Sequence, residues 1–81
     1  MEETAIRDTL IKMIKDYLPD LADKPLNMET VINTETGMDS MGFVLIISKL
    51  EALYNIKISE RQMNKFVTIG DVVHYIEAKV A

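Results

Sequence analysis

The stretch "TGMDSMGFVLIISKL", residues 36–50, decides the fold because it joins a helix start to the longest apolar run of the chain. Asp39 is of the type that caps helix N-termini, so a helix is predicted to begin almost at Ser40 and to run to about Tyr54. The apolar residues that predict its buried face repeat every three or four positions: Phe43, Ile46, Ile47, Leu50 and Tyr54. The role of Ser40, a polar residue at the start of so apolar a segment, needs an explanation.

The residues before this stretch predict one helix and one long connection. A helix is expected from Thr4 to Leu18, where Pro19 stops the pattern. Its apolar positions have helical spacing: Ile6, Leu10, Met13, Ile14, Tyr17 and Leu18. Residues 19–39 hold both prolines and no sustained period, which predicts a long loop. The apolar side chains expected to pin this loop to the core are Leu21, Leu26 and Ile32.

The residues after it predict two further helices. Ser59 and Gln62 have capping-box spacing and open a short third helix that ends near Lys65. Thr68 and Asp71 have the same spacing and start a fourth helix. Its apolar repeat consists of Ile69, Val72, Val73 and Ile76. The prediction is an all-α fold, a four-helix bundle of three longer helices and one short third helix, with a long loop between the first two. Residues 1–81 form one domain in this prediction.

Composition restricts the function classes. With 81 residues and 9.2 kDa, the chain is expected to bury one modest core. It contains no cysteine, so no disulfide, zinc-thiolate site or protein thiol is expected. The acidic N-terminus "MEETAIRD" lacks the features of a secretory signal, and the apolar run 41–47 is far shorter than the roughly 20 residues of a membrane span. We expect a cytoplasmic monomer.

The charge is unevenly distributed along the chain. The net charge of −4 argues against a nucleic-acid partner, since phosphate contacts need clustered Lys and Arg. Residues 1–39 carry four basic and nine acidic residues, which is 4 − 9 = −5. Residues 40–65 carry four basic and two acidic residues, which is 4 − 2 = +2. The segment around the serine is therefore the basic part of an acidic protein.

Three interpretations of Ser40 compete on the residues alone. A catalytic nucleophile would need a general base, but the single histidine, His74, is expected to be a partly exposed residue of the last helix, and no G-x-S-x-G elbow occurs. A calcium loop is excluded because its D-x-[DN]-x-[DN]-G pattern is absent, so no metal site is predicted. Because the parts of a catalytic triad are also missing, no enzymatic activity is predicted. An ordinary polar helix start in an unmodified helical adaptor remains open.

The segment "GMDSMGFVLIISKLEALYNIKIS" resembles the central part of acyl carrier proteins, in which an Asp-Ser pair followed by Leu or Met opens the second helix. The similarity continues through "TIGDVVHYIEA" and covers essentially the whole chain. It implies that Ser40 is esterified with the 4′-phosphopantetheine of coenzyme A. The arm would carry an acyl group as a thioester in fatty acid, polyketide or related metabolism. The motif "DSMG" is also similar to D-alanyl carrier proteins, which leaves a D-alanyl or aminoacyl carrier as the alternative.

The resemblance also implies partners and recognition residues. The implied partners are a phosphopantetheinyl transferase, an acyl-loading ligase or transferase, and downstream synthase enzymes. Asp39 would help the transferase hold magnesium besides capping the helix. The residues expected to meet partners are Met41, Val44, Leu45, Ser48, Lys49 and Ala52. Taken alone, an apolar stripe of this kind more often belongs to the core than to an interface.

Two departures from the family pattern carry expectations of their own. Gly42 replaces a polar or acidic residue, and since glycine costs a helix about 1 kcal/mol relative to alanine, either the first turn frays or a partner approaches closely. The second helix of ordinary acyl carriers shows an acidic face, whereas Glu51 is the single acid here. This predicts a dedicated partner and poor use by general fatty acid synthase enzymes.

Overall fold

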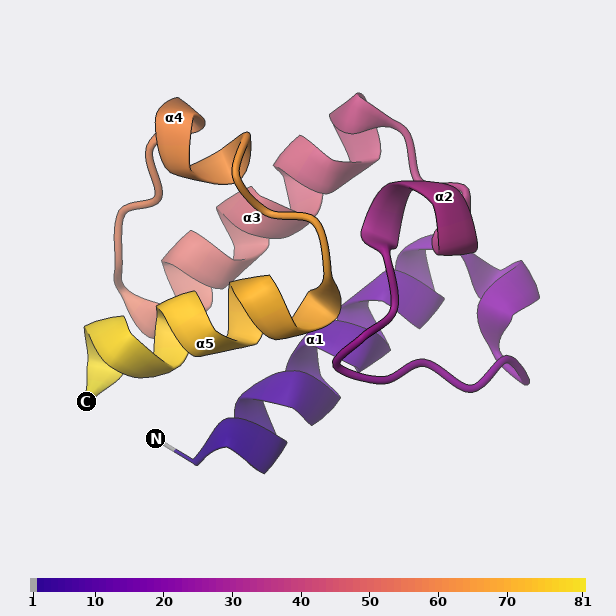
Figure 1. The fold of residues 1–81 in the computed structure, drawn as a ribbon, viewed down its shortest axis with the longest axis horizontal. Coiled ribbons are helices and arrows are strands. Elements are labelled where there is room, and N and C mark those ends of the chain that lie inside the picture. Colours follow the sequence, from indigo (N-terminus) through magenta and orange to yellow (C-terminus); the bar gives the residue numbers. More distant parts are fainter. Residues whose placement is uncertain (1) are drawn as a thin grey trace.

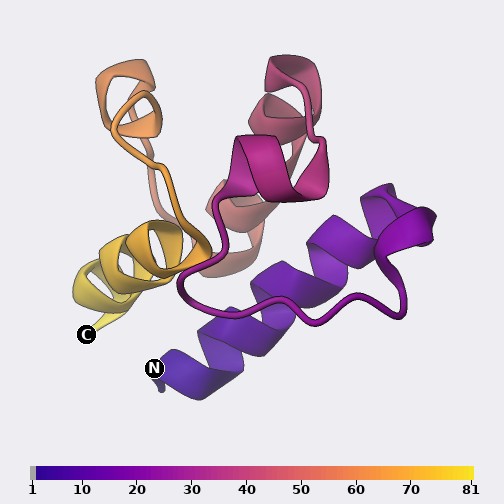
Figure 2. The same ribbon diagram turned by 45° about the vertical axis from the view of Figure 1, so that its right-hand side comes forward.

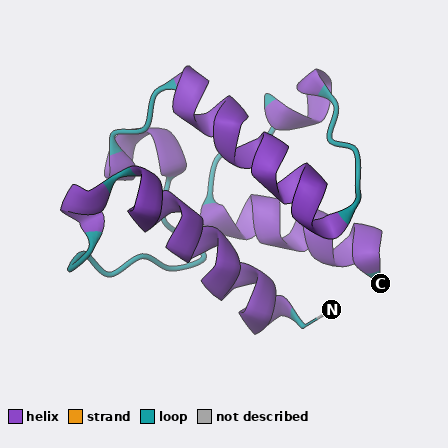
Figure 3. Ribbon diagram, turned by 180° about the vertical axis from the view of Figure 1, so that it is seen from behind, coloured by secondary structure: helices purple, strands orange, loops and turns teal. Residues whose placement is uncertain are grey.

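The computed structural model describes residues 2–81, and these form a helical bundle (Figure 1). The elements in chain order are α1 (Glu3–Tyr17), the 3-10 turn η1 (Pro19–Leu21), α2 (Ile32–Thr36), α3 (Ser40–Tyr54), α4 (Glu60–Met63) and α5 (Ile69–Val80). No strand occurs in the described residues (Figure 3). The predicted all-α fold, with three long helices and a short one before the last, is confirmed.

The three long helices form the body of the molecule. Helix α1 packs chiefly against α5 and also against α3. The two short helices α2 and α4 lie on either side of α3, and the connection after α1 runs along the outside of the bundle (Figures 1 and 2). The described chain begins and ends at the same side of the molecule, away from the start of α3 (Figures 1 and 2).

One core joins these helices, and the apolar periodicity of the sequence identifies most of it. Helix α1 buries Ile6, Leu10 and Ile14, as its spacing predicts. Of the predicted face of α3, Ile46, Ile47 and Leu50 are buried, and Phe43 and Tyr54 are partly buried against the same cluster. All four predicted positions of α5 are buried: Ile69, Val72, Val73 and Ile76.

The connection between α1 and α3 has more regular structure than its sequence indicates. It contains η1 and the five-residue helix α2, neither of which the apolar pattern predicts. Ile32 at the start of α2 is buried, and the Glu35 carboxylate accepts a hydrogen bond of 2.7 Å from the Val31 N–H. Leu21 and Leu26 pack partly buried against the core, so the expected pinning of the loop is confirmed.

Backbone hydrogen bonds tie this connection to the start of α5. Gly70 N–H donates to the Met28 carbonyl at 2.8 Å, Ile69 N–H to the Thr30 carbonyl at 3.0 Å, and Ile32 N–H to the Val67 carbonyl at 2.9 Å. We call these three bonds, together with the isolated bridge between Val31 and Thr68, the clasp. The clasp satisfies N–H groups that a helix start otherwise leaves without a partner.

The predicted caps of the last two helices are present. The Ser59 hydroxyl accepts from Gln62 N–H at 3.1 Å and starts α4, which ends at Met63, slightly before the expected position. Thr68 and Asp71 form a complete capping box at the start of α5. Hydrogen bonds from the backbone N–H groups of Thr68 and Val67 hold the pKa of the Asp71 carboxyl below its ordinary value of 3.8.

Candidate functional site

The candidate site begins with the cap of α3. The Asp39 backbone is extended, and its side-chain oxygen Oδ1 accepts from Gly42 N–H at 2.8 Å. The Asp39 carbonyl accepts from Phe43 N–H at 3.0 Å. Asp39 is therefore the N-cap that the sequence predicts, and Ser40 is the first residue of the helix.

Three residues join α2 to α3 and hold the start of α3, where Ser40 lies, in place. Gly37 ends α2 in the left-handed conformation, with φ 75°. Met38 is buried, and its N–H donates to the Thr36 hydroxyl at 3.2 Å. A buried anchor directly before the capping Asp39 leaves little freedom at the start of the helix, while Ser40 itself is exposed.

The serines of the chain are Ser40, Ser48 and Ser59, and they have different surroundings. The Ser59 hydroxyl is occupied as the cap of α4. Ser48 lies in the middle of α3, exposed but away from a helix end. Ser40 stands at a helix start whose capping role Asp39 has taken, so its hydroxyl is free of that role. The positive end of the α3 dipole favours an anion at this position.

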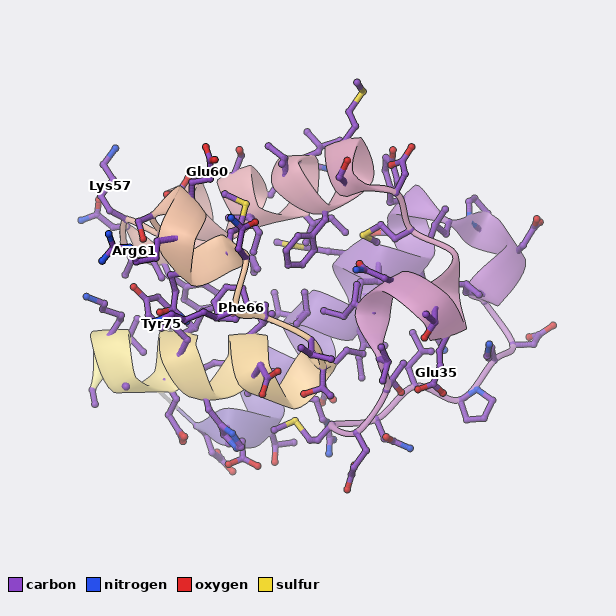
Figure 4. All side chains as sticks on the ribbon, turned by 45° about the horizontal axis from the view of Figure 1, so that its top comes forward. Glu35, Lys57, Glu60, Arg61, Phe66 and Tyr75 are labelled. Carbon is purple, nitrogen blue, oxygen red and sulfur yellow. The ribbon has the colours of Figure 1, made fainter. Side chains whose placement is uncertain are left out.

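A pocket of about 390 Å³ opens beside Ser40. Its apolar wall consists of Met38, Phe43, Met63 and Phe66, and Asn33 and Asn64 also line it. Phe66, labelled in Figure 4, is held edge-on between two rings, with centroids 6.4 Å from Phe43 and 5.6 Å from Tyr75. Phe66 therefore gives the pocket one wall that is part of a packed aromatic cluster.

These features fit a phosphopantetheine group. The exposed hydroxyl of Ser40 gives a transferase access, and the helix start suits the phosphate. The adjoining pocket has apolar walls and two amide side chains, which match an arm that alternates amide groups with methylene chains. The chain has no cysteine of its own to supply a thiol.

Gly42 has an intramolecular reason that the sequence does not reveal. A Cβ atom at this position would lie 2.5 Å from Cε2 and 2.9 Å from the hydroxyl oxygen of Tyr17. The first turn is capped, and Tyr17 of α1 fills the space that a side chain at position 42 would take. Neither expectation for Gly42, fraying or the approach of a partner, is needed. The glycine itself signals a close approach, but its spacing cannot identify a ring on another helix.

The residues expected to meet partners all lie on the outside of α3. Met41 is 79% exposed, Val44 48% and Leu45 44%, although all three are large and apolar. Ser48, Lys49 and Ala52 are exposed as well. The core interpretation of this stripe is wrong, because the core face of α3 is the opposite one. Its role as an interface stays a prediction.

The single histidine of the chain contacts α1. His74 is exposed on α5, as expected, and its Nε2 lies 3.4 Å from the Glu3 carboxylate. Within residues 2–81, no three acidic or histidine side chains are grouped closely enough to hold a metal ion. Over the same residues, no helix has the length and apolar character required to cross a membrane.

Comparisons with known proteins agree with this geometry. The family model described as a phosphopantetheine attachment site matches residues 8–76. An acyl carrier protein of Wolinella succinogenes is 32% identical over 73 residues, covering 90% of this chain and 95% of that protein. One from Campylobacter lari is 33% identical over 73 residues, covering 90% and 94%. The solved structure of a proposed acyl carrier protein from Mycobacterium tuberculosis superimposes with a TM-score of 0.82 at 24% identity, covering 91% of this chain and 97% of that one.

Proposed function

Because the chain belongs to the acyl carrier protein family, whose members bear 4′-phosphopantetheine and carry substrates rather than catalyse reactions, we propose that Ser40 is the attachment residue. The observation that carries this assignment is a serine hydroxyl that is exposed at the start of α3 while the neighbouring Asp39 makes the cap. Of the other serines, one is used as a cap and one lies in mid-helix.

The attached group would supply the terminal thiol that forms a thioester with an acyl group. The residues of this chain hold and present it. The N-terminus of α3 would stabilise the phosphodiester on Ser40, and the pocket lined by Phe43 and Phe66 would give the arm or the acyl group a place to lie. Tethering raises the effective concentration of the substrate at each partner enzyme. Asp39, exposed beside Ser40, is available to the transferase and its magnesium.

The proposed cargo is an acyl intermediate of fatty acid, polyketide or related metabolism, loaded by a ligase or transferase and passed to synthase enzymes in the cytoplasm. The apolar wall of the pocket supports an acyl group. The D-alanyl carrier alternative depends on the "DSMG" motif, and the packing of Tyr17 over Gly42 gives that glycine a structural reason independent of the cargo. We therefore favour the acyl carrier.

Mass spectrometry tests the attachment site. Wild type is incubated with coenzyme A, magnesium and a broad-specificity phosphopantetheinyl transferase, beside Ser40→Ala and the matched control Ser48→Ala on the same helix. We expect one added phosphopantetheine on wild type and on the control, and none on Ser40→Ala. Circular dichroism verifies that both variants are folded.

Two results would contradict the assignment. If wild type stays unmodified while a typical acyl carrier protein in the same tube is converted, the unmodified adaptor interpretation is favoured. If Ser40→Ala is modified as fully as wild type, the group is attached elsewhere, and peptide mapping identifies the residue.

A further inference from the structure

The outer face of α3 is an apolar strip that the described residues leave uncovered. Met41, Val44 and Leu45 are exposed although they are large and apolar, and Ser48 and Ala52 continue the face without adding charge. We call these five residues the α3 strip. It begins directly after Ser40, so an enzyme that docks beside the proposed attachment residue would contact the strip.

The two sides of the strip are fixed by contacts. On one side, Gly42 packs against Tyr17 of α1, and Lys49 lies two helical turns further along the same side. On the other side, the Glu51 carboxylate accepts from Ile58 N–H at 2.7 Å and so faces the segment that leads into α4. Lys57 and Arg61 belong to that segment and to α4. Lys49 therefore lies at one side of the strip, and the segment that carries Lys57 and Arg61 is joined to its other side through Glu51.

These cations are free, whereas those of the first half of the chain are engaged. Within the described residues, the first-half cations have partners: Arg7 with Asp8, Lys12 with Asp16, Lys15 with the Ala22 carbonyl and Lys24 with the Glu35 carbonyl. No ion pair or side-chain hydrogen bond of residues 2–81 involves Lys49, Lys57, Arg61 or Lys65.

The acids on this side do not balance them. Glu51 is half-buried and occupied by the Ile58 N–H, which leaves Glu60 as the exposed acid of α3 and α4. Figure 4 shows Glu60 beside Lys57 and Arg61 at the end of the molecule formed by α4. Residues 40–65 keep a charge of +2 in a chain of net charge −4.

We propose that the α3 strip and the cations beside it form a docking surface for a partner enzyme whose own docking face is apolar at its centre and acidic at its rim. This rests on the proposed function, since Ser40 stands at one end of the strip. Apolar contact supplies the attraction at short range, and complementary charge at the rim sets the encounter rate and the discrimination between partners. Enzymes that dock ordinary carriers through basic patches would be repelled.

A second copy of the chain and an anionic membrane fit less well. A symmetric dimer through the strip would bring Lys49, Lys57 and Arg61 of both copies to one interface, where Glu60 is the single exposed acid that each copy's α3 and α4 supply against three cations. Helix α3 carries a single lysine, and the net charge of −4 repels anionic lipid. Both remain as outcomes of the experiment.

Reversing the charges on the carrier and on the docking patch of a probe enzyme tests the proposal. Holo wild type is compared with Lys49→Glu/Lys57→Glu/Arg61→Glu, which reverses the cations beside the strip and is called the strip variant. The matched control is Arg7→Glu/Lys12→Glu/Lys15→Glu, which changes the net charge equally on α1. The probe enzyme is a malonyl transferase of a type II fatty acid synthase with its basic docking patch, and a version with that patch changed to glutamate. Malonyl transfer to free pantetheine, which uses no docking, normalises the two enzymes.

We expect wild type and the control to be used with about tenfold higher kcat/KM by the acidic-patch enzyme than by the basic one at low salt, and the strip variant to show the reverse order. Both preferences should fall towards unity in about 0.5 M NaCl, where the Debye length is only a few ångströms. Wild type that serves both enzymes equally, or that prefers the basic one, would overturn the proposal.

Three further readouts separate an enzyme docking surface from a failure of loading, a dimer contact and a membrane contact. Mass spectrometry before each assay verifies phosphopantetheine on Ser40, so a carrier that cannot be loaded contradicts the proposed function and not the docking surface. Sedimentation of wild type as a dimer that the strip variant abolishes would assign the strip to a second copy. Co-sedimentation with phosphatidylglycerol vesicles that the strip variant alone loses would assign it to a membrane.

Discussion

The starts of α3 and α5 share two features, a polar N-cap and a glycine in the first turn, but differ in how their side chains are used. Both begin with a polar N-cap, Asp39 for α3 and Thr68 for α5, and both have a glycine in the first turn. In α5, the Asp71 carboxylate accepts from the N–H groups of Thr68 and Val67, and the Thr68 hydroxyl accepts from Asp71 N–H. In α3, the cap uses Asp39 alone and leaves Ser40 exposed. One helix start is closed by its own side chains, and the other leaves exposed the serine that we propose as the attachment residue.

The glycines of these two helix starts differ in the same way. A Cβ atom on Gly70 would lie 2.9 Å from the Met28 carbonyl oxygen, which belongs to the backbone of the clasp. A Cβ atom on Gly42 would meet the ring of Tyr17, a side chain at the surface that can rotate away. The start of α5 is therefore confined by backbone, and the start of α3, where we propose the attachment site, by a movable side chain.

The largest expected effect comes from adding a methyl group at Gly70, with the same change at Gly42 as the comparison. Gly70→Ala should lower the free energy of unfolding by about 2 kcal/mol, because the Met28 backbone must shift and the Gly70 to Met28 hydrogen bond is disturbed. Gly42→Ala should change it by no more than about 0.5 kcal/mol, since the helix gains about 1 kcal/mol of propensity while the Tyr17 contact is loosened. Urea unfolding followed by circular dichroism measures both. Equal losses would show that the two helix starts are equally rigid.

A smaller, pH-dependent effect should distinguish the closed start. Asp71→Asn should cost about 1 kcal/mol near neutral pH, because a charged acceptor of two backbone N–H groups becomes a neutral one. The native pKa of Asp71 is lowered, so this stability is complete above 3.8 and is lost as the pH falls through the lowered native value.

Urea unfolding of wild type and Asp71→Asn over a series of pH values measures this difference. We expect the gap between them to be constant from neutral pH down to about pH 5 and to close in more acidic solution. A gap that persists unchanged in acid would mean that the Asp71 charge is not what closes the start of α5.

The smallest effect is expected at Ser40. Ser40→Ala should alter the free energy of unfolding by less than about 0.5 kcal/mol, because Asp39 makes the cap and the serine is exposed. The matched change Thr68→Ala removes a cap and should cost about 1 kcal/mol. Thermal unfolding of both variants decides the point. If Ser40→Ala is as damaging as Thr68→Ala, the start of α3 is structural after all.

Local chemistry accounts for what the sequence predicts well. The caps at Asp39, Ser59 and Thr68 each depend on residues within one helical turn, so their spacing suffices to predict three helix starts. The candidate role of Ser40 does not follow from Asp39 alone, because polar helix starts are common; it follows from the resemblance of the surrounding segment to acyl carrier proteins. Apolar periodicity predicts the buried faces of the long helices because each face has a single partner, the core.

Features that depend on distant residues are not predicted. Helix α2 has five residues and no apolar period, and it is held by the burial of Ile32 and by the clasp to Val67. The reason for Gly42 is the ring of Tyr17 on another helix. The pocket beside Ser40 is formed by residues from α2 to the segment after α4. Each of these needs the tertiary fold, which a local pattern does not contain.

The clasp also has a consequence for amide exchange with solvent. The first N–H groups of a helix ordinarily exchange readily because they lack a partner within the helix. Here Ile69 and Gly70 donate to carbonyls of the distant connection, at 3.0 and 2.8 Å. Their amide protons are released only when α5 separates from that connection, so they should exchange as slowly as global unfolding permits. Because the clasp joins the chain before α2 to the chain after α4, the segment bearing Ser40 is a loop whose two ends are held together by these same slowly exchanging hydrogen bonds.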